Sequence, residues 1–344
     1  MNRWHVLKRL LPLMVGLMLI LSACGREDLS TLNPQGPVAQ SQYDLMKLSI
    51  GIMALVVIVV FAICIYVLIR FRRRKGDNTI PKQVEGNHTL EIIWTSVPLI
   101  LLLILGVPTI QQVFNLSKDY SQDPDAIQVK VTAHQYWWEF EYPDYGITTA
   151  QDLIVPTGKK IYFQLHTADV KHSFWIPAIG GKMDTNAGIT NKMYLEFDKE
   201  GVFRGKCAEL CGPSHAYMDF KAKAVSEESF NNWIAAMHEP AQVAADAEIA
   251  TLFTNACLSC HAIGESTADS ARTGPDLTGI GGRVTVGSIL YNDEAPVADN
   301  LVEWITDPQK IKAGANMPSA GDMGLTPEQV QGIADYLADY KLNY

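Results

Sequence analysis

The chain has 344 residues, which is more than the about 100–200 residues of one soluble domain. Charged residues make up 19% of it, and 25 Gly and 17 Pro are ordinary numbers, so collagen-like, low-complexity and largely disordered chains are excluded. The net charge of −9 and the presence of only one short basic run exclude a nucleic acid as partner.

Residues 1–23 have the pattern of a secretory signal peptide. Three basic residues precede the apolar run Leu10–Leu21, and the sequence L-S-A-C ends at Cys24. This ending resembles the bacterial lipoprotein signal, which implies that Cys24 becomes a lipid-carrying N-terminus. A simple uncleaved anchor or a buried thiol is the alternative.

Two apolar stretches within the segment 24–118 predict a transmembrane helical hairpin. Leu48–Ile69 and Ile92–Ser117 contain no charged residue, and each is long enough to cross the hydrocarbon core of a bilayer. We place the two spans at about 46–70 and 92–114. The basic run Arg70–Lys75 between them should stay in the cytoplasm, so the chain after about residue 118 is expected outside it.

Residues 119–225 predict an all-β sandwich or barrel. Short β-rich runs, among them Ile127–Val131, Lys160–Leu165 and Met193–Phe197, alternate with turn signals rich in Pro, Gly and Asp. Cys64, in the first apolar stretch, has no partner at a useful spacing, and we expect it to be a small buried hydrophobic residue.

Side chains with soft or imidazole donors gather near the end of this β-rich unit: His172, Cys207, Cys211, His215 and Met218. Sulfur with imidazole suits copper, and a second thiolate in the same loop allows both sulfurs to bridge two copper ions. Each of the two histidines would then be the terminal ligand of one copper ion. A Cys207–Cys211 disulfide and a zinc site are alternatives. A disulfide explains neither His215 nor Met218, and methionine is a poor zinc ligand.

The H-S-F-W segment at His172 and the C-x-x-x-C-x-x-x-H-x-x-M motif that starts at Cys207 resemble subunit II of haem-copper cytochrome c oxidases over about residues 40–225. The resemblance implies a cupredoxin-like Greek-key fold with a dinuclear copper A centre. It adds Glu209 as a ligand through its carbonyl oxygen, and implies that the Glu209 side chain reaches a magnesium or manganese ion shared with subunit I.

Two further positions follow from the resemblance. The segment 134–138, H-Q-Y-W-W, is similar to an aromatic electron-entry segment in which tryptophan often follows His-Gln, whereas Tyr136 stands there in this chain. Tyr136 and Trp137 are both candidate electron relays, although packing of the sandwich core would also explain these rings. Glu91 resembles a glutamate at the mouth of a proton channel, and an ordinary interfacial carboxylate is the alternative.

After a linker at 226–247, residues 248–344 predict an all-α domain with a covalent haem. Cys257, Cys260 and His261 form a C-x-x-C-H motif, in which two thiols bond the haem vinyl groups and the histidine is an axial ligand. Met317 is the expected second axial ligand. Met323 is the alternative, and Met317 could instead fill a gap in the core.

The last domain resembles the class I cytochrome c fold. The resemblance rests on the segment 274–277, on Trp304 and on a closing helix over Thr326–Tyr340 with a capping signal at its start. Pro275 is expected beside His261, and Trp304 or Arg283 is expected at a haem propionate.

Together these segments resemble subunit II of a caa-type oxidase with a fused cytochrome c domain. The resemblance implies electron transfer through haem c and copper A to the haem a and haem-copper centre of subunit I, coupled to proton translocation, with no catalytic residue in this chain. Implied partners are subunits I and III, cytochrome c or a membrane-bound donor, and the bilayer of a bacterial plasma membrane. A quinol-oxidising relative would lack the copper ligands. A nitric oxide reductase-type complex and a tethered electron carrier without an oxidase core remain open.

Overall fold

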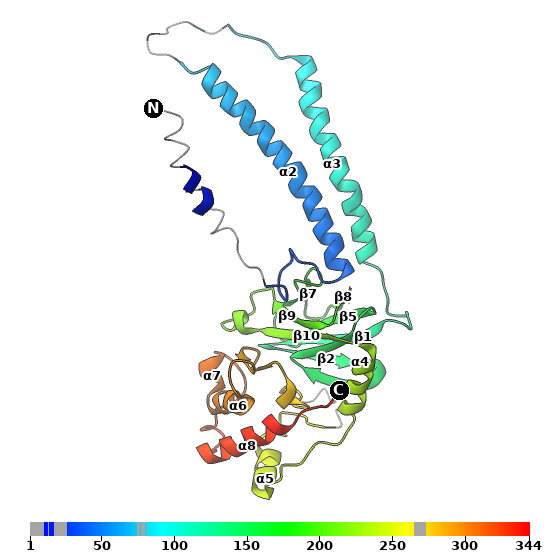
Figure 1. The fold of residues 1–344 in the computed structure, drawn as a ribbon, viewed down its shortest axis with the longest axis vertical. Coiled ribbons are helices and arrows are strands. Elements are labelled where there is room, and N and C mark those ends of the chain that lie inside the picture. Colours follow the sequence, from blue (N-terminus) through cyan, green and yellow to red (C-terminus); the bar gives the residue numbers. More distant parts are fainter. Residues whose placement is uncertain are drawn as a thin grey trace.

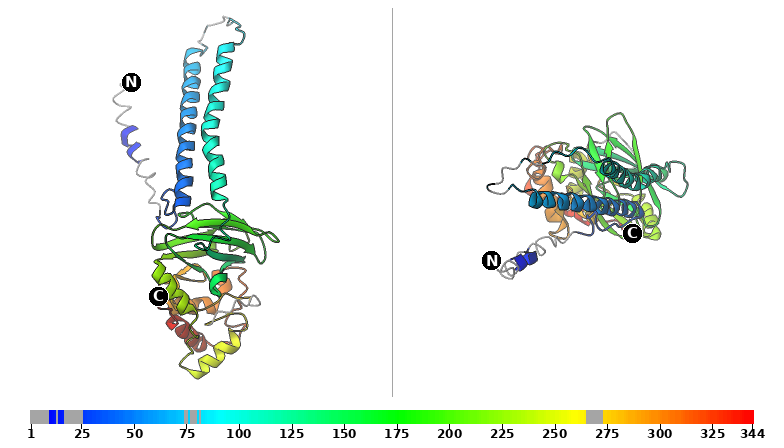
Figure 2. Two further views of the ribbon diagram at one scale, coloured as in Figure 1. Left: turned by 90° about the vertical axis from the view of Figure 1, so that its right-hand side faces the viewer. Right: turned by 90° about the horizontal axis from the view of Figure 1, so that it is seen from above.

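A helical hairpin, a pair of β-sheets and a small helical domain follow one another along the long axis of the molecule (Figure 1). This computed structural model describes residues 10–12, 14–16, 26–73, 76, 80, 82–264 and 273–344. The hairpin rises from one side of the sheets, and the C-terminal domain lies on the opposite side (Figure 2). The predicted fold class, an α-hairpin followed by an all-β and an all-α domain, is confirmed, with one two-stranded hairpin added in the last domain.

The hairpin consists of α2 (Pro37–Arg70) and α3 (His88–Leu116), both long and apolar enough to cross a membrane. Their apolar side chains are mostly exposed in the isolated chain, as lipid-facing side chains would be. The prediction that Cys64 is buried is wrong here, because its side chain lies on the exposed surface of α2. The start of α2 is fixed to the sheets, where the backbone N–H of Ala39 donates to Ile179 O at 3.0 Å.

Two five-stranded sheets form the sheet domain, with strand orders β3-β2-β1-β5-β8 and β4-β10-β9-β6-β7. Most neighbouring strands are antiparallel, but β1 pairs with β5 and β10 pairs with β4 in parallel. The strands are β1 (Ile127–His134), β2 (Trp137–Tyr142), β3 (Ile147–Ala150), β4 (Asp152–Pro156), β5 (Lys160–Thr167), β6 (His172–Trp175), β7 (Met183–Thr185), β8 (Asn191–Glu196), β9 (Gly201–Cys207) and β10 (Asp219–Val225).

Alternation along the strands decides which aromatic side chains enter the core. Buried and partly exposed residues alternate through β1 and β2, as expected for strands with one face in a sandwich core. In β2 this places Trp138 inside, where its ring centroid lies 5.5 Å from that of Phe174. Trp137 therefore points out of the sandwich, toward the C-terminal domain.

Helix α4 (Glu227–Met237) packs Phe230 and Trp233 against the sheet domain and leads to the C-terminal domain. That domain contains α5 (Ala247–Ala256), β11 (Thr285–Val286), β12 (Leu290–Tyr291), α6 (Val297–Thr306), α7 (Pro308–Ile311) and α8 (Pro327–Asp339). The expected capping signal is present, since the Thr326 side chain and Gln329 form a capping box at the start of α8.

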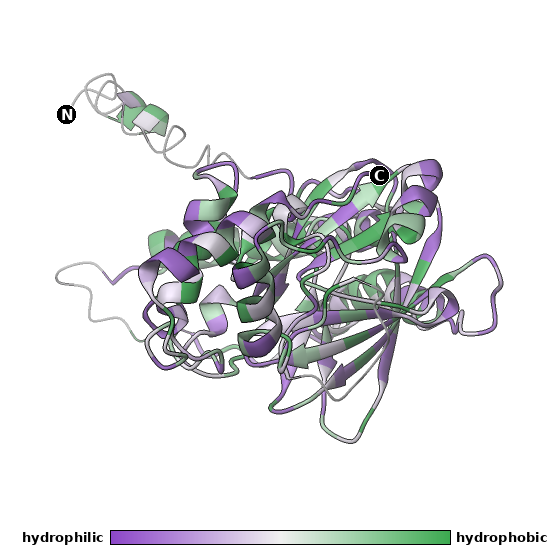
Figure 3. Ribbon diagram, turned by 90° about the horizontal axis from the view of Figure 1, so that it is seen from below, coloured by the Kyte–Doolittle hydropathy of each residue, from purple (hydrophilic) through white to green (hydrophobic). Residues whose placement is uncertain are grey.

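The helices of the C-terminal domain are amphipathic, and hydrophilic and hydrophobic residues alternate along them (Figure 3). Helix α8 buries Val330, Ile333, Ala334 and Leu337, spaced as one helical face. Together with Leu301 and Ile305 of α6 and Phe253 of α5, these residues form a second hydrophobic core that is separate from that of the sheets.

Candidate metal centre and haem pocket

The metal-ligand side chains predicted in the sheet domain converge at one end of the second sheet. His172 begins β6 and Cys207 ends β9, and these strands are hydrogen-bonded neighbours. The loop after β9 brings back Cys211, then a short 3-10 helix (His215–Tyr217), then Met218 directly before β10. Two rigid strands and one short loop thus position all five side chains.

The donor atoms of this cluster lie close enough to share metal ions. Cys207 Sγ lies 3.9 Å from Cys211 Sγ and 3.8 Å from His172 Nδ1. Cys211 Sγ in turn lies 3.6 Å from His215 Nδ1 and 3.8 Å from Met218 Sδ. The carbonyl oxygen of Glu209 is 3.3 Å from Cys207 Sγ. Both sulfurs are in the middle of the cluster, with a histidine on each side, which is an arrangement that fits soft metal ions.

The surroundings of the two thiols shift their pKa values in opposite directions. Burial opposes ionisation of Cys207, but its contact with His172 and nearby backbone N–H groups lower the pKa of this thiol overall. Burial and the neighbouring Cys207 sulfur raise the pKa of Cys211 to about 12. Because a metal ligand must be a thiolate, a cation in the cluster has to displace the proton of Cys211 against this raised pKa.

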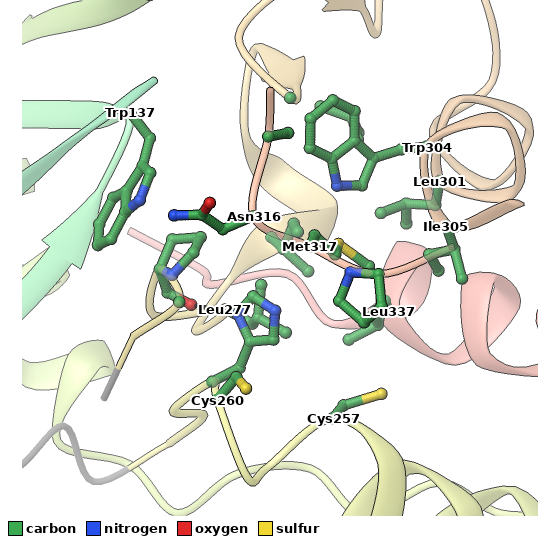
Figure 4. Close-up of a pocket in the computed structure, with 18 of the residues that line it drawn as sticks. Trp137, Cys257, Cys260, Leu277, Leu301, Trp304, Ile305, Asn316, Met317 and Leu337 are labelled. Carbon is green, nitrogen blue, oxygen red and sulfur yellow. Dashed lines mark hydrogen bonds between the residues drawn. The ribbon is translucent and has the colours of Figure 1, made fainter. Parts of the chain in front are cut away.

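The haem motif lines an apolar pocket in the C-terminal domain (Figure 4). Cys257, Cys260 and His261 follow α5 and stand at one wall, and Leu277, Leu301 and Leu337 contribute to the others. His261 Nδ1 lies 2.7 Å from Pro275 O, which leaves Nε2 as the nitrogen for a metal. Gly274 packs so closely on this imidazole that a Cβ there would lie 2.8 Å from His261 Cε1.

Both methionines considered as axial ligands line this pocket. Met317, in the loop between α7 and α8, lies opposite the C-x-x-C-H motif (Figure 4). Met323 also contributes to the lining, so the pocket alone does not separate the two. Trp304 and Arg283, the residues expected at a haem propionate, line it as well. The buried Arg283 guanidinium donates to the carbonyl oxygens of Asp276 and Thr278.

Comparison with known proteins covers almost the whole chain. Family models described as the transmembrane and periplasmic domains of cytochrome c oxidase subunit II match residues 31–112 and 146–225, and the model for cytochrome c matches 247–341. Cytochrome c oxidase subunit 2 of Alkalihalophilus pseudofirmus is 46% identical, with 99% of each chain covered. The chain belongs to the cytochrome c oxidase subunit II family.

Another member of the family, cytochrome c oxidase subunit 2 of Bacillus sp. strain PS3, is 48% identical, with 99% of this chain and 100% of that one covered. The solved periplasmic domain of cytochrome oxidase subunit II from Bradyrhizobium japonicum is 34% identical and covers 32% of this chain and 91% of its own, with a TM-score of 0.30. Membership makes the chain part of an oxidoreductase complex and implies copper A in the sheet domain and haem c in the C-terminal domain.

In this chain, Tyr136 lies against the metal loop and Trp137 lies at the haem pocket. Gln135 Nε2 donates to Cys211 O at 2.6 Å, and a Cβ on Gly212 would lie 2.4 Å from the Tyr136 hydroxyl oxygen, so Tyr136 packs against the metal loop. Trp137 stacks on His134 with 4.1 Å between ring centroids and lines the haem pocket (Figure 4). Trp138 packs in the sandwich core, and Tyr136 also belongs to the buried core cluster of the sheet domain, whereas Trp137 does not.

The remaining predicted positions are Glu91, the side chain of Glu209 and Cys24. Glu91 is in the first turn of α3, and its Oε2 lies 3.7 Å from His88 Nδ1. The Glu209 side chain is partly exposed beside the metal loop, with Oε2 3.9 Å from Lys182 Nζ. Cys24 lies outside the described residues.

Sequence reasoning missed Asp169, which supports the metal cluster through a contact with one of its histidines. Asp169 Oδ1 lies 2.7 Å from His172 Nε2, and Asp169 Oδ2 accepts a hydrogen bond from the backbone N–H of Gln135 at 2.6 Å. Burial opposes protonation of His172, yet Asp169 and Cys207 raise the pKa of its imidazole overall. Nothing in the composition of the 168–172 loop distinguishes this aspartate from other turn residues.

Proposed function

We propose that this chain receives electrons at haem c, passes them to copper A and delivers them to subunit I of a cytochrome c oxidase that reduces dioxygen. One observation carries the proposal. The dipeptide Tyr136-Trp137 contacts the loop of the metal cluster with one side chain and lines the haem pocket with the other. Adjacent residues of one strand end therefore connect the two sites directly.

The described side chains supply a complete ligand set for both groups. His172, Cys207, Cys211, His215 and Met218 would hold two copper ions, with the Glu209 carbonyl oxygen as a further ligand. Cys257 and Cys260 would form the thioether bonds to haem c, with His261 and Met317 as axial ligands. Once bound, the two groups supply one-electron redox chemistry. Protein atoms would take the ligand positions of both groups, which would leave neither group a position for a substrate.

The protein's own contribution between the sites is rigid positioning. Tyr136 is buried against the metal loop, and Trp137 is held by its stacking on His134. Both rings are thus held in place between the two sites. We therefore assign Tyr136 and Trp137 as the electron relay of this chain.

Proton and partner functions are proposed for residues on the faces away from the C-terminal domain. Glu91, at the cytoplasmic start of α3, would stand at the mouth of a proton channel. The Glu209 carboxylate would share a magnesium or manganese ion with subunit I, whose ligands complete that site. Subunit III and a soluble or membrane-bound cytochrome donor complete the assembly, and proton translocation belongs to the whole complex in the bacterial plasma membrane.

We also propose that the leader 1–23 is removed and that Cys24 carries a lipid. Labelling growing cells with a radioactive fatty acid should tag the wild-type chain, whereas Cys24→Ser should remain untagged. A protein that begins at Met1 and takes up no label would contradict the lipoprotein proposal without affecting the electron path.

Metal and haem analysis tests the central proposal. The purified chain should hold copper and haem c at a ratio of two to one, and the spin resonance spectrum of the oxidised protein should show hyperfine splitting from two equivalent copper nuclei. A single copper ion per chain, or splitting from one nucleus, would contradict the dinuclear assignment.

Purification of the complex from membranes separates the remaining functions. Co-purification with a many-span subunit and oxygen uptake with reduced cytochrome c support the oxidase. Reduction of nitric oxide without oxygen uptake would instead identify a nitric oxide reductase-type complex. A chain that exchanges electrons but brings down no integral subunit would be a tethered carrier.

A further inference from the structure

A buried lysine joins the C-terminal domain to the backbone beside Trp137. Lys312, just after α7, is only 3% exposed. Its Nζ donates to Tyr136 O at 2.6 Å, to Ser288 Oγ at 2.9 Å and to Gly287 O at 3.1 Å. Burial lowers the pKa of Lys312 to about 7. In its protonated form the amine has three donors, and here each has an oxygen acceptor. One acceptor belongs to the sheet domain and two to the C-terminal domain.

The hydrogen bonds continue through Ser288 back to the sheet domain. Ser288 Oγ accepts from Gln151 Nε2, and Gln151 Oε1 accepts from the backbone N–H of Trp138 at 2.9 Å. The carbonyl of Tyr136 and the N–H of Trp138 belong to the two peptide groups that flank Trp137. Both of these peptide groups are therefore held by one continuous network that crosses the domain interface.

The residue after Lys312 contacts the metal loop. Ser214 Oγ, between Cys211 and His215, donates to the carbonyl oxygen of Ala313 at 2.7 Å. Four residues further along the chain, Met317 lines the haem pocket. The segment 312–317 thus contacts the carbonyl of Tyr136 and then the metal loop at its start, and lines the haem pocket at its end.

Stability alone does not explain a lysine at this position. A buried ammonium loses its hydration, and replacing such a group with an apolar side chain is often neutral or stabilising. A buried amine with three fixed acceptors does restrict how the two domains can dock, because any other orientation would leave donors or acceptors unpaired.

We propose that Lys312 is a positioning residue, which fixes the C-terminal domain and Trp137 in one geometry for electron transfer from haem c to copper A. The proposal rests on the proposed function for its purpose. The hydrogen-bond network consists of residues of this chain alone. Its presence can therefore be tested by amide hydrogen exchange, and its purpose by the rate of electron transfer.

The primary variant is Lys312→Met, which keeps the length of the side chain and removes its donors. Lys310→Met is the matched control, since Lys310 is an exposed lysine two residues away. In full-length protein with both cofactors, haem c is reduced by a light pulse and the reduction of copper A is followed. We expect Lys312→Met to slow this step roughly tenfold or more, as small misplacements of reacting groups do, and Lys310→Met to leave it unchanged.

Two further readouts separate positioning from general damage. The optical spectrum of the haem and the spin resonance of the copper should stay unchanged in Lys312→Met, because neither ligand set is altered. Amide hydrogen exchange should become faster in peptides that cover 135–138 and 286–290, but not in α8. Slow transfer together with altered cofactor spectra would assign Lys312 to the integrity of a site and overturn the proposal.

A second variant decides the question if Lys312→Met does not fold. Ser288 has φ 78°, a conformation that glycine adopts without strain, so Ser288→Gly removes the side chain whose hydroxyl links Lys312 to Gln151 and does not strain the backbone. We expect a smaller slowing in the same direction. Wild-type transfer rates and wild-type exchange in the variants would overturn the proposal. If wild-type protein itself shows no transfer, the proposed function fails, and the exchange data alone then decide whether the network exists.

Discussion

Asp169 Oδ1 lies 2.7 Å from His172 Nε2, on the side of the imidazole that faces away from Cys207. The other ring nitrogen, Nδ1, is 3.8 Å from Cys207 Sγ and faces the cluster of sulfur donors. A metal-ligating histidine usually donates its second N–H to a carboxylate, which fixes the ring and its tautomer. Asp169 therefore holds His172 in the orientation that a metal at Nδ1 requires.

Asp169→Asn should weaken copper binding by roughly 10–100-fold, the usual effect of losing a partner of a ligating histidine. The variant keeps the size of the side chain and removes its charge. Competition with a copper chelator, followed by the copper absorption bands, measures the change. Asp184→Asn is the control. Asp184 lies on the same sheet and pairs with Lys171 at 2.8 Å, and no contact of its carboxylate with a sulfur or imidazole donor of the cluster is found among the described residues. Equal copper affinity in wild type and Asp169→Asn would contradict this role.

Met317→Leu should abolish the weak long-wavelength absorption band that a methionine sulfur gives when bound to ferric haem, and should lower the reduction potential, because thioether ligation raises it. Leucine has nearly the same volume, so the pocket should stay filled. Met323→Leu provides the matched comparison, since Met323 lines the same pocket. Loss of the band in Met323→Leu and not in Met317→Leu would reverse the assignment of the axial ligand.

Gly274→Ala should reduce the fraction of chain with correctly ligated haem. The added Cβ would lie 2.8 Å from His261 Cε1 and 3.1 Å from Cys260 O, so the imidazole has to move away from its contact with Pro275 O. Haem content per chain and the ligation spectrum measure the effect. Gly321→Ala is the control, because its Cβ would meet only Ser319 Oγ at 3.8 Å. Full haem content with a native spectrum in Gly274→Ala would show that this close approach is not needed.

Local patterns in the sequence account for most elements but not for their docking. The C-x-x-C-H motif and the sulfur-rich loop are short, so chain connectivity alone brings Cys257 near His261 and Cys207 near Cys211. The alternation of side chains in strands also predicts that Trp137 and Trp138 face opposite ways. Which of the two enters the core depends on how β2 pairs with β1, and one sequence does not reveal that register.

Contacts between distant parts of the chain could not be predicted. Lys312 and Tyr136 are 176 residues apart, and their hydrogen bond exists only because two domains with separate hydrophobic cores pack together. No periodicity or spacing reports such an encounter. No motif in the sequence marks Lys312, whereas in the structure it is among the most buried polar side chains.

The last prediction concerns Lys221, a second buried lysine at the domain interface. Its side chain lies in β10 and is 1% exposed, with Nζ 5.0 Å from the ring centroid of Tyr291 in the C-terminal domain. No hydrogen-bond partner of Nζ is found among the described residues. Burial lowers the pKa of Lys221 from 10.5 to about 8, against the attraction of Asp219 and Asp152.

The sign of the pH dependence follows from this lowered pKa. Below pH 8 both folded and unfolded chains carry the proton, and the folded state bears the whole cost of the buried charge, roughly 3 kcal/mol. Between about pH 8 and 10.5 the unfolded chain binds more protons, so this group makes the stability rise with pH. Above that range its cost is gone.

At pH 7, Lys221→Met should therefore have a higher melting temperature than wild type. Between pH 8 and 10 the melting temperature of the variant should increase less with pH than that of wild type, or not at all. Thermal unfolding of the full-length protein in detergent, followed by circular dichroism at several pH values, measures the difference from wild type. Lys199→Met, at an exposed lysine, should follow the wild-type profile. A Lys221→Met profile parallel to that of wild type across this range would mean that Lys221 keeps an ordinary pKa, and that the interface around Tyr291 is hydrated enough to accept its charge.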